Sequence, residues 1–126
     1  MDSLARFTQP ELDYLLGEAG LGRLAAADTT GLPHVVPVGW SYNSERGTID
    51  ISGRDFAGTR KFRNARANPQ AAFVVDDVLP PWRPRCVMVQ GHAQALPPGR
   101  GSHSSSEAML RIWPHTIISW GLDTAP

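Results

Sequence analysis

A basic segment that also carries glycines and hydroxyls is the part of this sequence best suited to chemistry. Residues 52–66 read SGRDFAGTRKFRNAR and contain five cations and one acid, in a chain whose net charge is zero. At a helix that begins near Thr59, free N–H groups and a partial positive charge attract anions. Thr59 adds a hydroxyl donor, and Arg60 and Lys61 add full charges. The segment therefore predicts a phosphate site, and the alternative is a solvated basic helix face.

A second candidate is the apolar run VVPVGW at residues 35–40. Pro37 lies inside this otherwise strong strand pattern and removes one hydrogen-bond donor from the ladder. A flat heteroaromatic ring could lie against Val36 and Val38 and bond the freed main-chain groups, as in mostly apolar cofactor clefts. The alternative is an edge strand that tolerates a proline.

A third candidate is the proline-rich turn LPPWRPR at residues 79–85. It presents the indole of Trp82 between guanidinium groups, one of them from Arg83, and Trp and Arg are common interface anchors. The turn could reach across a dimer to a cofactor or substrate, or it could be a structural turn with a packed Trp82. Near the other end of the chain, Trp120 is expected to pack in the core.

Several other chemistries find no support in the sequence. Cys86 is the single cysteine, so no internal disulfide or thiol pair can form, and a buried, inert thiol is expected there. The serines of segment 102–106 lack the strand-turn-helix context of a nucleophile elbow. The histidines do not fall at metal-ligand spacing, so no metal is expected; they are His34, His92, His103 and His115.

Length and composition limit the class of protein. With 126 residues, the chain is expected to form one domain over residues 1–126 with one hydrophobic core. Its 12 basic and 12 acidic residues balance, so neither nucleic acid nor a membrane is expected as a partner. The start lacks a signal-peptide pattern, and no apolar run approaches the roughly 18 residues that span a bilayer. A cytoplasmic protein is expected.

Hydrophobic periodicity predicts a mainly β protein with minor α. The expected helical parts are a helix at 10–19, a short helix from about residue 59 to 68, and a helical turn at 108–112. Residues 97–106 are expected to be a flexible loop. Six short strands are expected, at 21–27, 33–40, 48–52, 71–75, 86–96 and 115–121. Their number and brevity favour an antiparallel barrel, since closure hides strand edges.

Four segments, in this order along the chain, resemble the pyridoxamine 5′-phosphate oxidase-like family. They read LGRLA at 21–25, GLPHVVPV at 31–38, TRKFRN at 59–64 and NPQAAFVVDD at 68–77. The likeness runs from about residue 7 to residue 123 and is strongest to the short actinobacterial deazaflavin-dependent oxidoreductases.

The resemblance implies a six-stranded split β-barrel of the FMN-binding type, working as a homodimer with its cofactor in a cleft between subunits. The ring system of the cofactor would lie along Val36, Pro37 and Val38. The positions implied to hold the cofactor phosphate are Ser52, Arg54, Thr59, Arg60 and Lys61. Trp82 and Arg83 would come from the partner subunit.

The function implied is that of an oxidoreductase that uses a deazaflavin, coenzyme F-420, to move hydride to or from a small organic substrate with an activated double bond. Hydride transfer depends on alignment of two flat molecules, so the absence of an obvious acid-base pair is compatible with an enzyme. FMN is the alternative cofactor; it lacks the long acidic tail of the deazaflavin, which needs a basic channel. The chain could instead be a non-catalytic flavin or haem carrier or sensor, or a structural dimer without a ligand.

Overall fold

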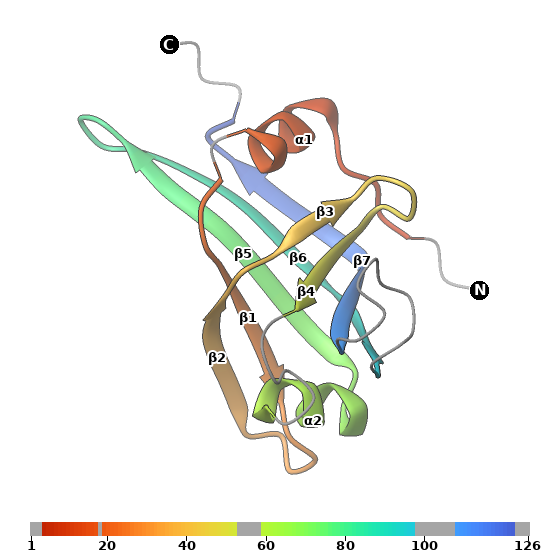
Figure 1. Cartoon of the computed structure of the whole chain (residues 1–126). Helices are drawn as coiled ribbons and strands as arrows, with labels where there is room; N and C mark the ends of the chain where they lie inside the picture. Colours follow the sequence, from red (N-terminus) through yellow and green to blue (C-terminus); the bar gives the residue numbers. More distant parts are fainter. Residues whose placement is uncertain (1–3, 18, 53–58, 98–107, 123–126) are drawn as a thin grey trace.

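A computed structural model of the chain describes residues 4–17, 19–52, 59–97 and 108–122. That part of the chain forms two helices and seven strands (Figure 1). Their bounds, in chain order, are α1 Gln9–Leu16, β1 Gly22–Ala27, β2 Pro33–Val38, β3 Ser41–Asn43, β4 Thr48–Ser52, α2 Arg60–Ala67, β5 Gln70–Leu79, β6 Arg83–Leu96 and β7 Met109–Trp120. The predicted mainly β class is confirmed.

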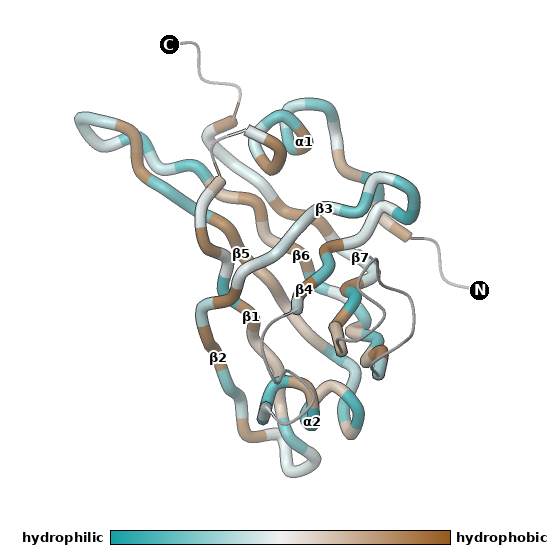
Figure 2. The backbone as a smooth tube through the Cα atoms, in the orientation of Figure 1, coloured by the Kyte–Doolittle hydropathy of each residue, from teal (hydrophilic) through white to brown (hydrophobic). Residues whose placement is uncertain are grey.

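The strands form one antiparallel sheet in the order β2-β1-β5-β6-β7-β4-β3, which curls into a half-barrel (Figure 1). Hydrophobic stretches alternate along the central strands, whereas the β3–β4 turn and α2 carry many hydrophilic residues (Figure 2). The curl encloses the apolar core, because the inward positions of neighbouring strands meet there. Its most completely buried members are Ile49, Ile51, Val75, Val87, Val89, Leu110 and Ile112.

The sheet has seven strands where six were expected. The additional strand, β3, pairs Ser41 with Asp50 and Asn43 with Thr48 of β4. Its three residues are too few to show an alternating pattern, so the sequence marked this stretch only as part of a turn.

The expected helical turn at 108–112 is wrong, because residues 109–112 are the first four of the strand β7. All five residues of the segment are buried, including Arg111, which is 4% exposed. A strand buried on both faces shows no alternation of polar and apolar residues, and a charged residue inside it interrupts the apolar run that would indicate burial.

The hairpin of β5 and β6 is longer than expected. β5 continues from Gln70 to Leu79, and β6 begins at Arg83 and runs through Pro84.

The interpretation of Trp120 as a core residue is wrong, since its side chain is 49% exposed on this chain.

Helix α1 starts where the sequence predicted and ends earlier. The Thr8 hydroxyl accepts a hydrogen bond from the Glu11 N–H, and the Glu11 carboxylate accepts one from the Thr8 N–H, which forms a capping box. The helix stops at Leu16, before the expected end at residue 19. Glu11 is buried because its other oxygen accepts a hydrogen bond from the Ser119 hydroxyl on β7, at 2.6 Å.

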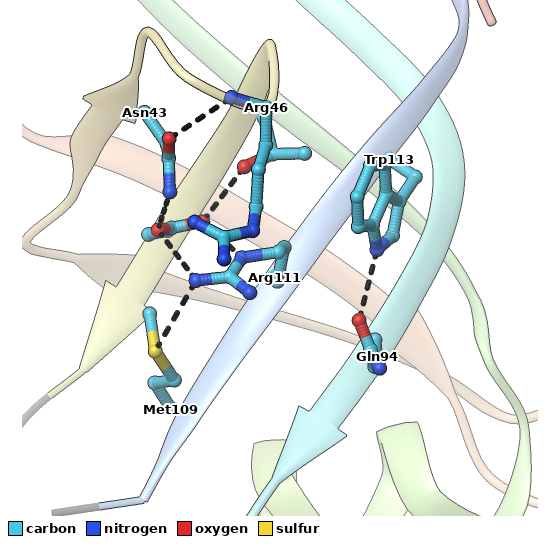
Figure 3. Close-up of polar contacts among 8 residues, drawn as sticks. Asn43, Arg46, Gln94, Met109, Arg111 and Trp113 are labelled. Atoms are coloured by element: carbon cyan, nitrogen blue, oxygen red, sulfur yellow. Dashed lines mark hydrogen bonds and ion pairs between the residues drawn. The ribbon is translucent and has the colours of Figure 1, made fainter. Parts of the chain in front are cut away.

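A buried ion pair joins β4 to β7. Asp50 and Arg111 lie opposite each other in the strand register, with Nε–Oδ1 at 3.2 Å and Nη2–Oδ2 at 3.3 Å. Their side chains are 11% and 5% exposed. Figure 3 shows Arg111 among neighbouring side chains of β4, β7 and the β3–β4 turn. A buried charge is tolerated only while its partner is present, so each residue holds the other in the sheet.

We expect Asp50→Asn to lower the free energy of unfolding by about 3–5 kcal/mol, because Arg111 would keep a buried charge without a counter-ion. Urea denaturation measures the change. The matched control is Asp76→Asn, which breaks the exposed pair of Arg23 and Asp76 (53% and 51% exposed) and should cost at most about 1 kcal/mol. Equal losses in the two variants would contradict the buried role.

A second polar cluster fixes α1 to the β5–β6 hairpin. The Tyr14 hydroxyl donates to Asp77 at 3.0 Å, and Arg85 donates two hydrogen bonds to the same carboxylate at 2.9 and 2.6 Å. The Arg85 guanidinium also lies over the Tyr14 ring, 4.9 Å from its centre. The hydrogen bonds from Arg85 are the largest cause that lowers the pKa of Asp77 below 3.8, while burial raises the pKa of Tyr14 above 10.

The lowered pKa of Asp77 predicts a pH dependence of stability. Because the carboxyl binds its proton less tightly in the folded chain, its stabilisation is complete above pH 3.8 and is lost as the pH falls through the folded pKa. The free energy of unfolding should therefore decline on acidification from about pH 5 to about pH 2. Asp77→Asn should flatten that decline in urea titrations at each pH. Identical slopes for the two proteins would rule out this contribution.

Candidate functional site

The start of α2 is built as the sequence predicted. Thr59 is the N-cap, and its hydroxyl oxygen accepts the Phe62 N–H at 3.3 Å. Arg60 and Lys61 are the first two helical residues. Phe62, 2% exposed, packs in the core cluster and fixes the helix at the end of the half-barrel nearest the β1–β2 turn (Figure 1).

The charges of α2 are arranged against the helix dipole. Its first turn contains no acid, and Arg60, Lys61 and Arg63 gather near the end that already carries a partial positive charge. Each cation there is unfavourable by roughly 0.3–1 kcal/mol, which a bound anion would offset. The arrangement is suited to a phosphoryl group.

A contact between His34 and Arg60 joins β2 to the start of α2. The Arg60 guanidinium lies against Nε2 of the His34 imidazole. A guanidinium can only donate, so a hydrogen bond between these two groups uses Nε2 as its acceptor. Sequence reasoning treated His34 as an isolated histidine. Strand alternation was the available signal, since it puts His34 on the same face as Val36 and Val38.

Strand β2 lies at the edge of the sheet, where its described pairing is to β1 alone. Pro37, opposite Arg23, is exposed, and an edge is where a missing N–H is tolerated. Val36 packs against the core, and Val38 is 5% exposed within it. The Val38 side chain therefore belongs to the core, and β2 offers a ligand its main chain and the half-buried side of Val36.

The remaining candidates fall in three places. Ser52 is exposed at the end of β4, on the margin of a polar pocket. Arg54 lies within residues 53–58, outside the described residues. Trp82 and Arg83 lie at the tip of the β5–β6 hairpin, which projects away from α2 (Figure 1). Trp82 is 76% exposed, so the alternative of a packed indole does not hold within one chain.

Cys86 is buried at 2% exposure, and burial raises the pKa of its thiol, as expected of an inert cysteine. Across residues 4–17, 19–52, 59–97 and 108–122, no three His, Cys, Asp or Glu side chains gather in a way that could hold a metal ion. The same ranges contain no helix with the length and apolar character needed to cross a membrane.

The family is decided by a match to the sequence model of pyridoxamine 5′-phosphate oxidase, which spans residues 8–113. The chain belongs to this family. The matched region includes β2, the start of α2 and the β5–β6 hairpin, so every candidate site residue falls inside it.

Among curated relatives, the chain is 48% identical over 122 residues to a 5a,11a-dehydrotetracycline/5a,11a-dehydrooxytetracycline reductase of Streptomyces rimosus subsp. rimosus, covering 93% of this chain and 84% of that protein. Solved structures with the same fold include a conserved hypothetical protein of Mycobacterium tuberculosis, with a TM-score of 0.73, 17% identity and coverage of 98% and 91% of the two chains. An F-420 reductase has a TM-score of 0.63, 18% identity and coverage of 84% and 94%. A FAD-binding protein of Mycobacterium smegmatis has a TM-score of 0.67, 20% identity and coverage of 90% and 94%.

Proposed function

We propose that this protein is a reductase that uses coenzyme F-420 to transfer hydride to an activated double bond of a small organic substrate. The observation that carries the proposal is the acid-free, basic start of α2, held against β2 by the contact of His34 with Arg60. It places a basic helix start beside β2, an edge strand whose described pairing is to β1 alone. The 48% identical relative, named as a dehydrotetracycline reductase, supports the reaction class.

The residues present fit a cofactor with a phosphoryl group and a planar ring. Helix N–H groups, the Thr59 hydroxyl, Arg60 and Lys61 would hold the phosphoryl group, and Ser52 and Arg54 are proposed to assist. The β2 main chain at Val36, Pro37 and Val38 would border the ring. When bound, the deazaflavin supplies the hydride. The chain's own contribution is to orient two flat molecules, so we assign no catalytic acid or base.

We further propose that the working form is a homodimer. Several large apolar side chains are exposed on this chain: Val35, Val78, Trp82, Ile118 and Trp120. A shallow depression of about 630 Å³, lined in part by alanines, also lies over β1, β5, β6 and β7. Exposed apolar area of this kind marks an interaction surface, and a second copy would cover it. Trp82 and Arg83 of the partner subunit would then reach the cofactor cleft.

The function is tested by titrating the purified protein separately with coenzyme F-420 and FMN, followed by turnover assays. We expect tight F-420 binding, turnover of activated alkenes with the reduced cofactor, and a dimer mass in sedimentation. Preference for FMN would favour the flavin-dependent alternative, which the family match also supports. Tight binding without turnover over a broad substrate panel would favour a carrier or sensor. No thermal shift with either cofactor would contradict the proposal.

Variants at the start of α2 test the phosphoryl site. Lys61→Ala should weaken cofactor binding by about 1.5–3 kcal/mol, because it removes a charge-assisted bond. His34→Ala should weaken binding less, and His34→Gln should restore it, since the amide oxygen can still accept from Arg60. The matched control is Arg66→Ala, which removes an exposed charge from the last turn of α2. Unchanged affinity in Lys61→Ala would count against the site.

A further inference from the structure

A polar pocket of about 570 Å³ lies between the β3–β4 hairpin and the start of β7. Its lining includes Ser41, Ser44, Arg46, Asp50, Ser52 and Arg111. Three serine hydroxyls and two guanidinium groups make it rich in hydrogen-bond donors. The sequence prediction did not include it, because Arg46 and Arg111 are 65 positions apart in the chain and only the fold brings them into one pocket.

Asp50 has no acceptor capacity left for a ligand. Its Oδ1 accepts from the Thr48 hydroxyl at 2.9 Å and from Arg111 Nε at 3.2 Å. Its Oδ2 accepts from Asn43 Nδ2 at 3.0 Å and from Arg111 Nη2 at 3.3 Å. A carboxylate offers about four lone-pair positions, and here all of them are used (Figure 3). The Asp50 carboxylate is thus fully hydrogen-bonded, by Arg111 and by residues of the β3–β4 hairpin.

Arg46 is the available cation of the pocket. Its main-chain N–H donates to Asn43 Oδ1 at 3.1 Å, which fixes the β3–β4 turn. Its side chain is exposed and has no partner among the described residues. Figure 3 shows its side chain directed toward that of Arg111, rather than outward from the turn. The pocket lining therefore includes two guanidinium groups and the carboxylate of Asp50, which is already fully hydrogen-bonded. The exposed Glu45 also lines the pocket, at the tip of the turn.

We propose that this pocket binds a carboxylate group of an organic ligand. Arg46 would pair with the carboxylate in the two-point geometry that a guanidinium offers, and the serine hydroxyls would donate to the remaining lone pairs. Ser52 places the pocket at the end of β4, directly before the segment that leads to the N-cap Thr59. This inference rests on the proposed function, because the carboxylate belongs either to the acidic tail of the deazaflavin or to the substrate.

The test compares Arg46→Gln with the wild-type chain, and uses Arg66→Gln as the control that removes an equal charge outside the pocket. Dissociation constants are measured for coenzyme F-420, which has acidic groups beyond its phosphoryl, and for FMN, which ends there. In parallel, glutarate is titrated into the cofactor-free protein while the amide signals of Ser44 and Arg46 are followed by NMR. Arg46 is exposed on a turn, so its replacement should not unfold the chain.

If the cofactor tail supplies the carboxylate, Arg46→Gln weakens F-420 binding about tenfold and leaves FMN binding within about twofold. Arg66→Gln would then change both affinities alike. If the substrate supplies it, glutarate shifts the pocket amides in wild type but not in Arg46→Gln, and F-420 affinity is unchanged. Glutarate without effect, together with equal cofactor affinities in wild type and Arg46→Gln, would overturn the proposal. Failure of the wild-type chain to bind either cofactor would contradict the proposed function, while the glutarate titration would still test whether the pocket binds a carboxylate.

Discussion

The burial of Phe62 is the constraint on which the proposed cofactor site depends. Helix α2 has eight residues, four of them cations, and a peptide of that length and charge would not remain helical alone. Phe62 and Ala65 are 2% and 4% exposed, so their packing in the core forces the helix to form. The cations are thereby held beside the positive end of a dipole. The apolar core thus maintains an electrostatic arrangement that the segment would not adopt by itself.

Two contacts align that helix with the sheet. His34 meets Arg60 at its start, and Asn68 Nδ2 donates to the Asp28 carbonyl at its end, at 3.4 Å. Both partners belong to the β1–β2 hairpin, so these contacts fasten the helix to the hairpin that contains the edge strand. A cofactor that contacts both would meet a preorganised surface, which reduces the entropy lost on binding.

The sequence predicted those features that depend on local patterns. Strand 48–52 was predicted with its observed bounds, because alternation is clear there, and a helix start near Thr59 was expected where the strand pattern breaks. The segment at 108–112 was assigned incorrectly because the burial of its charged residue, Arg111, depends on a partner 61 residues away, Asp50. The roles proposed for His34 and Arg46 depend on neighbours that are distant in the sequence, so only the folded chain reveals them. The exposure of Trp120 likewise depends on where the curl of the sheet ends.

The two open ends of the sheet share a property that matters for behaviour in concentrated solution. β2 carries exposed prolines, Pro33 and Pro37, and β3 is only three residues long. Unpaired edges recruit further strands and seed fibrils, whereas prolines and short strands make poor templates for that growth. The two edges of the described sheet thereby discourage open-ended polymerisation of the chain.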